Sequence, residues 1–140
     1  MKEDKKQYAA SLLPFRKRGN EWEFYLQKRG SEFRILPNMF AMFGGSIEAG
    51  ETPEEACVRE IEEELQYAPA SMKYFSRYES GTAIIHVFIE EVADDFESRV
   101  TVCEGEYGMF KPVSVVRSAP DVALFTKLIV LEVVLYLDSV

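Results

Sequence analysis

Three glutamates that follow a glycine-rich stretch are the residues of this chain best suited to chemistry. Glu60, Glu63 and Glu64 are spaced three and four apart, so on a helix they lie near one another. Like charges at such spacings repel, and a hard cation such as Mg²⁺ or Mn²⁺ would reverse the sign of that interaction. Because Mg²⁺ keeps waters and takes substrate phosphates as further ligands, an incomplete carboxylate cluster predicts a metal shared with a phosphorylated substrate.

The segment before the helix is expected to complete this site. Glu51 could reach the same end of the cluster, and Gly44 and Gly45 let the backbone approach a metal or phosphate closely. Glutamate-rich helix faces are more often plain solvated surface. The three glutamates alone would favour that alternative, and the residues around them decide against it.

The helix that must position these carboxylates has clear start signals. Thr52 and Glu55 form a Thr-x-x-Glu capping box, and Pro53 occupies the first helical position. At 100° per residue, an apolar face of Val58, Ile61 and Leu65 is predicted, with the glutamates on a neighbouring face. Arg59 lies four residues before Glu63 and is expected to hold that carboxylate in place.

The full spacing resembles the signature of the Nudix hydrolases. In that signature a Gly is followed after five residues by Glu, and after seven more by Arg-Glu, an aliphatic residue, any residue, Glu-Glu, any residue, Gly and an aliphatic residue. The matching residues here are Gly45, Glu51, Arg59, Glu60, Ile61, Glu63 and Glu64. Two positions depart, since Gln66 replaces the Gly and Tyr67 replaces the aliphatic residue. The Gly suits a left-handed helix C-cap, so either Gln66 costs about 1 kcal/mol there or the helix ends differently before Pro69.

The resemblance implies hydrolysis of a nucleoside diphosphate linked to another moiety, with water as the nucleophile and Mg²⁺ or Mn²⁺ as cofactor. By position it implies that the metal ligands are Glu60, Glu63 and Glu64, with Glu51 in the outer shell. Arg59 would orient Glu60 or Glu63, and helix geometry favours Glu63. The resemblance implies that the base that accepts the proton of the water is a signature glutamate or one from a later loop, Glu104 or Glu106. Glu104 is preferred because related sequences often carry Glu-Gly there, as Glu104 and Gly105 do here, and a solvated acidic turn is the competing interpretation for Glu106.

The substrate class follows only by elimination. Subfamily marks for hydrolysis of ADP-ribose, dinucleoside polyphosphates and NADH are absent after the signature, which leaves a MutT-like enzyme acting on a (deoxy)nucleoside triphosphate. Its products would be the monophosphate and pyrophosphate. The residues predicted to contact the substrate are Gly44, Gly45, Phe33 and Arg34. The alternative is a catalytically silent Nudix domain that senses a nucleotide.

The remaining patterns predict one α/β domain over residues 1–140, with residues 1–7 as a frayed tail. Alternating or continuous apolar runs predict strands at residues 8–15, 22–28, 40–43, 72–79, 83–91, 99–103 and 108–111. A polar turn is expected at residues 94–98, a helical turn at 113–117 and a helix at 121–137. Strands interrupted by one helix and followed by another predict a mixed β-sheet covered by helices, and the resemblance implies the Nudix α/β/α sandwich.

Charge and composition restrict the partners. A net charge of -8 opposes binding to nucleic acid, although bound metal would still admit a small nucleotide.

The two cysteines, Cys57 and Cys103, are predicted to be small buried residues, which favours a cytoplasmic location. The apolar segment at residues 129–137 is short for a membrane span, so a helix covering the sheet is expected, and a homodimer interface is the competing interpretation.

Overall fold

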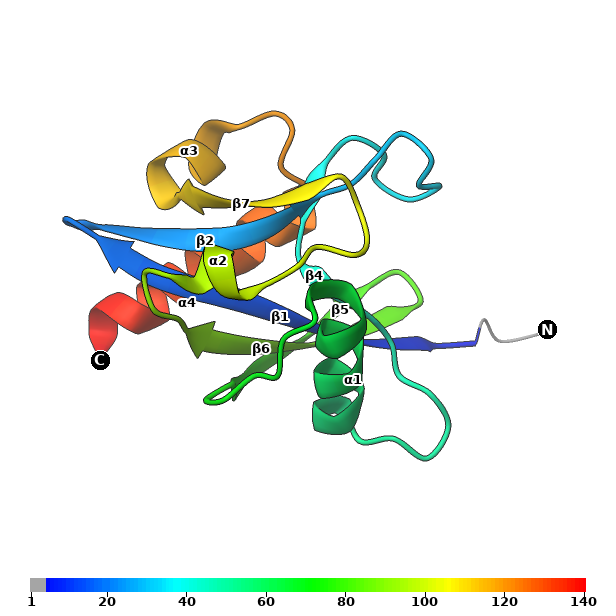
Figure 1. The fold of residues 1–140 in the computed structure, drawn as a ribbon. Helices are drawn as coiled ribbons and strands as arrows, with labels where there is room; N and C mark the ends of the chain where they lie inside the picture. The colour runs from blue at the N-terminus through cyan, green and yellow to red at the C-terminus, as the bar shows by residue number, and fades with distance from the viewer. Residues whose placement is uncertain (1–4) are drawn as a thin grey trace.

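A mixed β-sheet forms the middle of the computed structural model, which describes residues 5–140 (Figure 1). The elements are β1 (Gln7–Arg18), β2 (Glu21–Lys28), β3 (Phe40–Ala41), β4 (Phe43–Ser46), α1 (Pro53–Leu65), β5 (Lys73–Ser80), β6 (Ala83–Glu91), α2 (Phe96–Arg99), β7 (Tyr107–Pro112), α3 (Val113–Ser118) and α4 (Leu124–Ser139). The expected tail at residues 1–7 lies mainly outside the described residues, and Gln7 already belongs to β1.

The strands run in the order β3-β2-β1-β6-β5, with β4 paired to β1 and β7 paired to β2. β1 and β6 are parallel, and the other pairs are antiparallel. The long β1 has apolar residues on both of its faces because both faces are covered. Leu13 and Phe15 pack on the side of α4, whereas Ala10 and Leu12 pack on the side of α1.

Two apolar clusters therefore hold one helix on each face of the sheet. Ile129, Val130 and Val133 of α4 belong to the first cluster, and Cys57, Ile61 and Leu65 of α1 belong to the second. Figure 1 shows α1 and α4 on opposite sides of the strands. The predicted α/β/α sandwich with a mixed sheet is confirmed, and none of the helices in residues 5–140 is long and apolar enough to cross a membrane.

Three local predictions were wrong. Residues 99–103 were expected to form a strand, but this segment bonds to the end of α1: the Thr101 amide donates to the Leu65 carbonyl at 2.9 Å and the Cys103 amide to the Glu64 carbonyl at 2.7 Å. The last carbonyls of a helix lack intrahelical donors, and this segment supplies them. The polar turn contains the short α2, and Cys103 is exposed rather than buried.

Candidate metal and phosphate site

Local sequence fixes the start of α1 as predicted. The Glu55 amide donates to Thr52 Oγ1 at 3.1 Å, and the Thr52 amide donates to Glu55 Oε1 at 2.9 Å, which completes the capping box. The buried face of α1 is rotated slightly from the predicted apolar face. Val58, which was expected on that face, is 40% exposed, while Cys57 and Glu64 are buried beside Ile61. The helix thus turns Glu64 into the protein, leaves Glu60 half-buried at the edge and exposes Glu63.

The two glycines of β4 make room for this helix face. Gly45 is paired with Ala10 of β1, and a Cβ there would come within 2.5 Å of the Glu60 carboxylate. Gly44 has a φ of 150° and lies against the Ala10 carbonyl and Ser11, so a side chain would collide with the neighbouring strand. Close packing against β1 therefore requires a glycine at position 44, and Gly45 lets the Glu60 carboxylate lie directly against the backbone.

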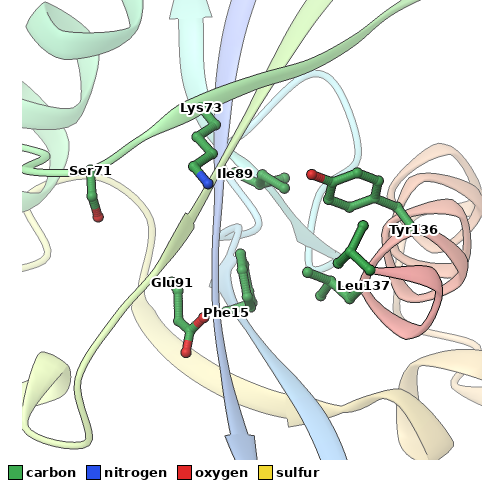
Figure 2. A pocket seen from close by; sticks show the side chains of 8 residues that line it. Phe15, Ser71, Lys73, Ile89, Glu91, Tyr136 and Leu137 are labelled. Atoms are coloured by element: carbon green, nitrogen blue, oxygen red, sulfur yellow. The ribbon is translucent and has the colours of Figure 1, made fainter.

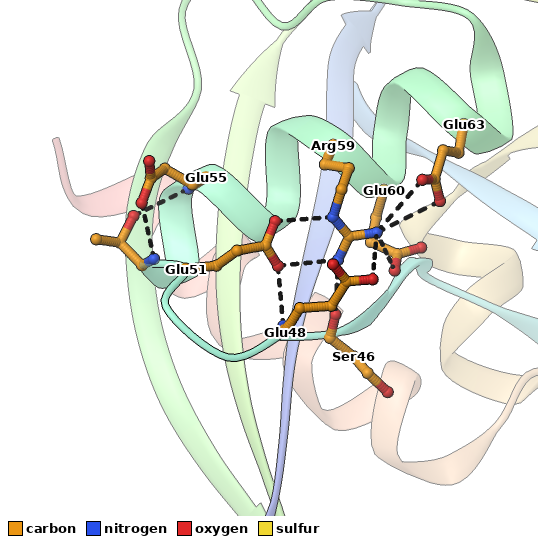
Figure 3. A network of polar contacts seen from close by, with 8 residues as sticks. Ser46, Glu48, Glu51, Glu55, Arg59, Glu60 and Glu63 are labelled. Atoms are coloured by element: carbon orange, nitrogen blue, oxygen red, sulfur yellow. Dashed lines mark hydrogen bonds and ion pairs between the residues drawn. The ribbon is translucent and has the colours of Figure 1, made fainter.

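Arg59 is the centre of the polar network at the start of the site (Figure 3). Its guanidinium holds Glu51 with two hydrogen bonds, Nε to Oε2 at 2.8 Å and Nη2 to Oε1 at 3.0 Å. Nη1 donates to Glu60 Oε1 at 3.0 Å, and Nη2 also donates to the Ser46 carbonyl at 3.0 Å. Contacts to Glu63 are longer, at 3.4 Å.

Arg59 thus contacts both of the carboxylates that it was expected to orient, Glu60 and Glu63, but its shorter bonds are to Glu60 and to Glu51 rather than to Glu63. A planar guanidinium binds a carboxylate best through two parallel hydrogen bonds, and Glu51 accepts such a bidentate pair from the loop before the helix. Hydrogen bonding to Arg59 lowers the pKa of Glu51. Glu51 Oε1 also accepts the Glu48 amide at 2.9 Å, so both oxygens of Glu51 already have partners. Glu51 acts here as a support for Arg59 and, through it, for Glu60.

Glu64 has the most unusual environment of the cluster. It is 3% exposed, and its Oε2 has no hydrogen-bond partner. Burial, followed by the nearby Glu104 and Glu60 carboxylates, raises the pKa of Glu64 to about 9, while a hydrogen bond from the Gly44 backbone opposes the shift. Burial also raises the pKa of Glu60. A buried carboxyl without a full set of partners is costly unless a cation or proton is present.

The fold brings Glu104 to this carboxylate from a distant part of the sequence. The bond between the Cys103 amide and the Glu64 carbonyl docks the segment that carries Glu104 on the end of α1. Gly105, with a φ of 83°, lies close to Gln27 and to the Lys28 carbonyl. Glu106 is exposed, and its amide donates to the Lys28 carbonyl at 2.8 Å. Of the two loop glutamates, Glu104 is the one coupled to Glu64.

Two residues of this site were missed from the sequence. Gln27 is 1% exposed, its Nε2 donates to the Glu104 carbonyl at 3.0 Å, and its Oε1 accepts from Arg29 Nη1 at 3.3 Å. Burial lowers the pKa of the Arg29 guanidinium, and the Glu104 and Glu64 charges oppose that effect, which places Arg29 beside the acidic cluster. A glutamine directly after the apolar run of residues 24–26 was the available signal, because a buried polar side chain needs partners.

Two of the predicted substrate contacts, Phe33 and Arg34, lie in the loop that follows Arg29. The Arg29 guanidinium carbon lies 4.1 Å from the ring centre of Phe33, and Arg29 Nε donates to the Ile35 carbonyl at 2.9 Å, so Phe33 belongs to the surroundings of the site. Arg34 is exposed in the same loop. Leu36 and Asn38 of this loop have φ values of 53° and 62°, a conformation that is rare for leucine.

The chemistry of the donor set fits a divalent cation, although the cluster is not a closed cage. Within residues 5–140, no three His, Cys, Asp or Glu side chains converge closely enough to form a complete protein site. Mg²⁺ and Mn²⁺ suit this set of oxygen ligands, which consists of an unpartnered buried oxygen of Glu64, the half-buried Glu60 and the adjacent glycine backbone. Both ions fill their remaining coordination positions with water and phosphate oxygens. The metal-binding expectation is thus compatible with this structure.

A partly open pocket of about 290 Å³ lies elsewhere (Figure 2). It is lined by Phe15, Ser71, Lys73, Ile89, Glu91, Tyr136, Leu137 and Val140, and Figure 2 shows Tyr136 and Leu137 projecting from α4. None of the clustered glutamates lines it. The carboxylate cluster, and not this pocket, is where the groups suited to phosphate chemistry meet.

Both departures from the expected signature have a local explanation. Gln66 adopts the left-handed conformation, with φ 50° and ψ 45°, and its amide donates to the Glu62 carbonyl, so the helix ends as a glycine would end it. The Tyr67 hydroxyl donates to the buried Glu90 at 2.6 Å, and its ring centre lies 5.1 Å from that of Phe96. Tyr67 thereby ties the end of α1 to β6 and α2.

Comparisons with known proteins agree with this geometry. Residues 5–123 match the NUDIX domain family. The 8-oxo-dGTP diphosphatase of Escherichia coli is 37% identical over 57 residues, or 41% of this chain and 43% of that protein. The nucleoside triphosphatase NudI of an Enterobacter species is 46% identical over 46 residues, or 33% of each chain, so the alignments span less than half of these relatives.

The fold also has solved counterparts. The NUDIX domain of Shewanella oneidensis NrtR, crystallised with ADP ribose, superposes with a TM-score of 0.78 at 12% identity, covering 96% of this chain and 90% of that one. At this identity the likeness concerns the fold alone. The family match covers most of the chain and includes the capped helix, the two glycines and the carboxylates described above, and this chain therefore belongs to the NUDIX domain family.

Proposed function

We propose that this protein is a metal-dependent pyrophosphohydrolase that cleaves a nucleoside diphosphate linked to another moiety. The preferred substrate is a (deoxy)nucleoside triphosphate, which water would convert to the monophosphate and pyrophosphate. The observation that carries the proposal is the buried Glu64 carboxyl, which lies beside Glu60, Glu104 and the Gly44 backbone with one oxygen unpartnered. The names of the two relatives, a diphosphatase and a nucleoside triphosphatase, support this reaction class.

The cofactor in this proposal is Mg²⁺ or Mn²⁺, held by Glu60, Glu63 and Glu64, with Glu51 in the outer shell through Arg59. When bound, the metal supplies positive charge that neutralises the phosphates and favours attack by water. The backbone groups of Gly44 and Gly45 are the proposed contacts to phosphate, and the space beside Gly45 is shared with the Glu60 carboxylate. Arg59 keeps Glu60 turned toward Gly45 through the bond from Nη1 to Glu60. Two hydrogen bonds to Glu51 in turn hold the Arg59 guanidinium in place.

Water attacks phosphorus, the bond between phosphorus and the bridging oxygen breaks, and pyrophosphate leaves. One carboxylate must accept the proton released by the water. We assign this role to Glu104 rather than to Glu106, because Glu104 lies near enough to Glu64 to raise the pKa of that carboxyl. Arg29, held by Gln27 and the Ile35 carbonyl, is positioned to bind phosphate, and Phe33 and Arg34 are the proposed contacts to the base or ribose.

The test is phosphate or pyrophosphate release with Mg²⁺ or Mn²⁺ on ordinary and oxidised nucleoside triphosphates, nucleotide sugars, ADP-ribose and dinucleoside polyphosphates. Glu63→Gln and Glu64→Gln should each lower kcat by two or more orders of magnitude. Glu62→Gln is the matched control, since Glu62 is an exposed carboxylate of the same helix outside the cluster. Undiminished turnover in the first two variants would remove the proposed site.

A nucleotide-sensing domain remains the second candidate, because the fold is shared with a domain crystallised with ADP ribose and the cluster is not a closed metal cage. Nucleotide binding without turnover across the panel would favour this candidate. The free Cys57 and Cys103 support the proposed cytoplasmic location, and the net charge of -8 supports a small nucleotide rather than nucleic acid as partner. A homodimer, the remaining proposed partner, depends on α4 rather than on the carboxylates.

A further inference from the structure

The pocket shown in Figure 2 has an apolar floor and charged groups at its edge. Phe15 of β1 and Ile89 of β6 form the floor, and they are 5% and 4% exposed. Leu137 of α4 is partly buried beside them. Lys73 of β5 and Glu91 of β6 line the same pocket and are exposed. Apolar walls with a small number of polar groups are the usual composition of a small-molecule site.

The strand register places both charged side chains on the face of the sheet that α4 covers. Lys73 is paired with Ile89 across β5 and β6. Glu91 is paired with Phe15 across β6 and β1. Paired residues point to the same face, and Phe15 and Ile89 both belong to the apolar cluster on the α4 side. Lys73 and Glu91 are therefore diagonal neighbours, a relationship that puts Cα atoms about 7–8 Å apart in an antiparallel pair.

These two charges are not used by the protein itself. The ion pairs formed within residues 5–140 involve other groups, so neither Lys73 nor Glu91 has a charged partner there, although the two are diagonal neighbours. Figure 2 shows the Lys73 ammonium turned toward Ile89 and the Glu91 carboxylate beside Phe15. The pocket therefore offers one positive and one negative group above the same apolar floor.

A ligand that satisfies both groups carries a carboxylate, an ammonium close to it and an apolar substituent. An α-amino acid with an apolar side chain has this form. Its carboxylate accepts from the Lys73 ammonium, its ammonium donates to the Glu91 carboxylate, and its side chain contacts the apolar floor. The Ser71 hydroxyl also lines the pocket and is a further donor for the ligand carboxylate.

The size of the pocket agrees with this class of ligand. Its volume of about 290 Å³ lies at the lower end of the range of small-molecule pockets, about 300–1,000 Å³. We propose that this pocket binds a free α-amino acid with an apolar side chain, such as leucine. The glutamates of α1 do not line the pocket, and α1 packs on the opposite face of the sheet. The proposal is thus independent of the proposed hydrolysis, and its failure would leave that reaction untouched.

The experiment is a titration of L-leucine into the full chain, followed by NMR of isotope-labelled isoleucine and leucine methyl groups. Saturable shifts are expected at Ile89 and Leu137. N-acetyl-leucine lacks the ammonium and leucinamide lacks the carboxylate, so each should bind roughly threefold or more weakly than leucine, since each loses one charged contact at the edge of the pocket. Aspartate, which would bring a charge onto the apolar floor, should not bind.

Two variants assign the contacts. Lys73→Gln should weaken leucine binding by roughly threefold or more and leave leucinamide binding unchanged, and Glu91→Gln should do the same for leucine and N-acetyl-leucine. Arg77→Gln and Glu79→Gln are the matched controls, because both residues are exposed charges of β5 that do not line the pocket. No saturable shift of the floor methyl groups, equal affinity for leucine and its two analogues, or an equal loss in the control variants would overturn the proposal. Tighter binding of N-acetyl-leucine than of leucine would also overturn it, and would indicate the C-terminal residue of a peptide instead.

Discussion

Replacing Glu64 by Gln should stabilise the metal-free protein, and the gain should increase with pH. Glu64 is 3% exposed, and burial raises its pKa to about 9, with Glu104 and Glu60 adding to the shift. The unfolded chain releases this proton near the ordinary value of 4.5. Between these two pH values the folded state holds a proton that the unfolded state has lost, so the stability of the wild type falls as pH rises.

The size of the effect follows from the two pKa values. At pH 7 the interval above 4.5 is 2.5 pH units, and at 1.36 kcal/mol per unit the wild type has lost about 3 kcal/mol of unfolding free energy relative to acidic solution. Gln is neutral at every pH and keeps nearly the same shape, and its amide can donate to Glu104. Glu64→Gln should therefore match the wild type near pH 4.5 and exceed it by about 3 kcal/mol at pH 7.

The assay is urea unfolding of both proteins at pH 5, 6, 7 and 8 with EDTA present. Glu63→Gln is the control, and it should follow the pH profile of the wild type because Glu63 is exposed. A stability difference between Glu64→Gln and the wild type that stays constant over this range would refute the reasoning. Adding Mg²⁺ at pH 8 should stabilise the wild type more than Glu64→Gln, because metal replaces the proton on a carboxylate ligand.

Three further changes test the supports of the site. Gln66→Gly should raise the unfolding free energy by about 0.5–1 kcal/mol in urea titrations, because position 66 has a φ of 50°; no gain would mean that the side chain has contacts worth as much. Gly45→Ala should lower kcat at least tenfold, since the new Cβ would come within 2.5 Å of the Glu60 carboxylate and displace it, and a change in KM alone would contradict this account. Arg59→Lys should lower kcat while circular dichroism stays unchanged, because Lys cannot make the two-bonded pair with Glu51; full activity would show that Glu60 needs no such support.

Local sequence was sufficient to predict α1 and its role in the fold. The start of this helix depends on Thr52, Pro53 and Glu55, which interact within one turn, so no distant residue is needed to predict it. The Gly-Glu-Arg spacing indicated the family, and the order of strands interrupted by one helix and followed by another indicated a sheet covered by helices. The segment at residues 99–103 was mistaken for a strand, because its apolar residues do not reveal that its amides bond to the end of α1.

The sequence by itself determined which carboxylates lie on the helix and that a glycine pair precedes them. Only the tertiary structure decided how these glutamates differ, because burial depends on the strands packed against α1: Glu64 is enclosed, Glu60 lies against Gly45 and Glu63 remains in water. The approach of Glu104 to Glu64 and the bond from Gln27 to the Glu104 carbonyl join residues far apart in the chain, and Arg59 reaches Glu51 across the loop before the helix. Helical periodicity describes neighbours within one turn, whereas these contacts depend on how the loops close over the sheet.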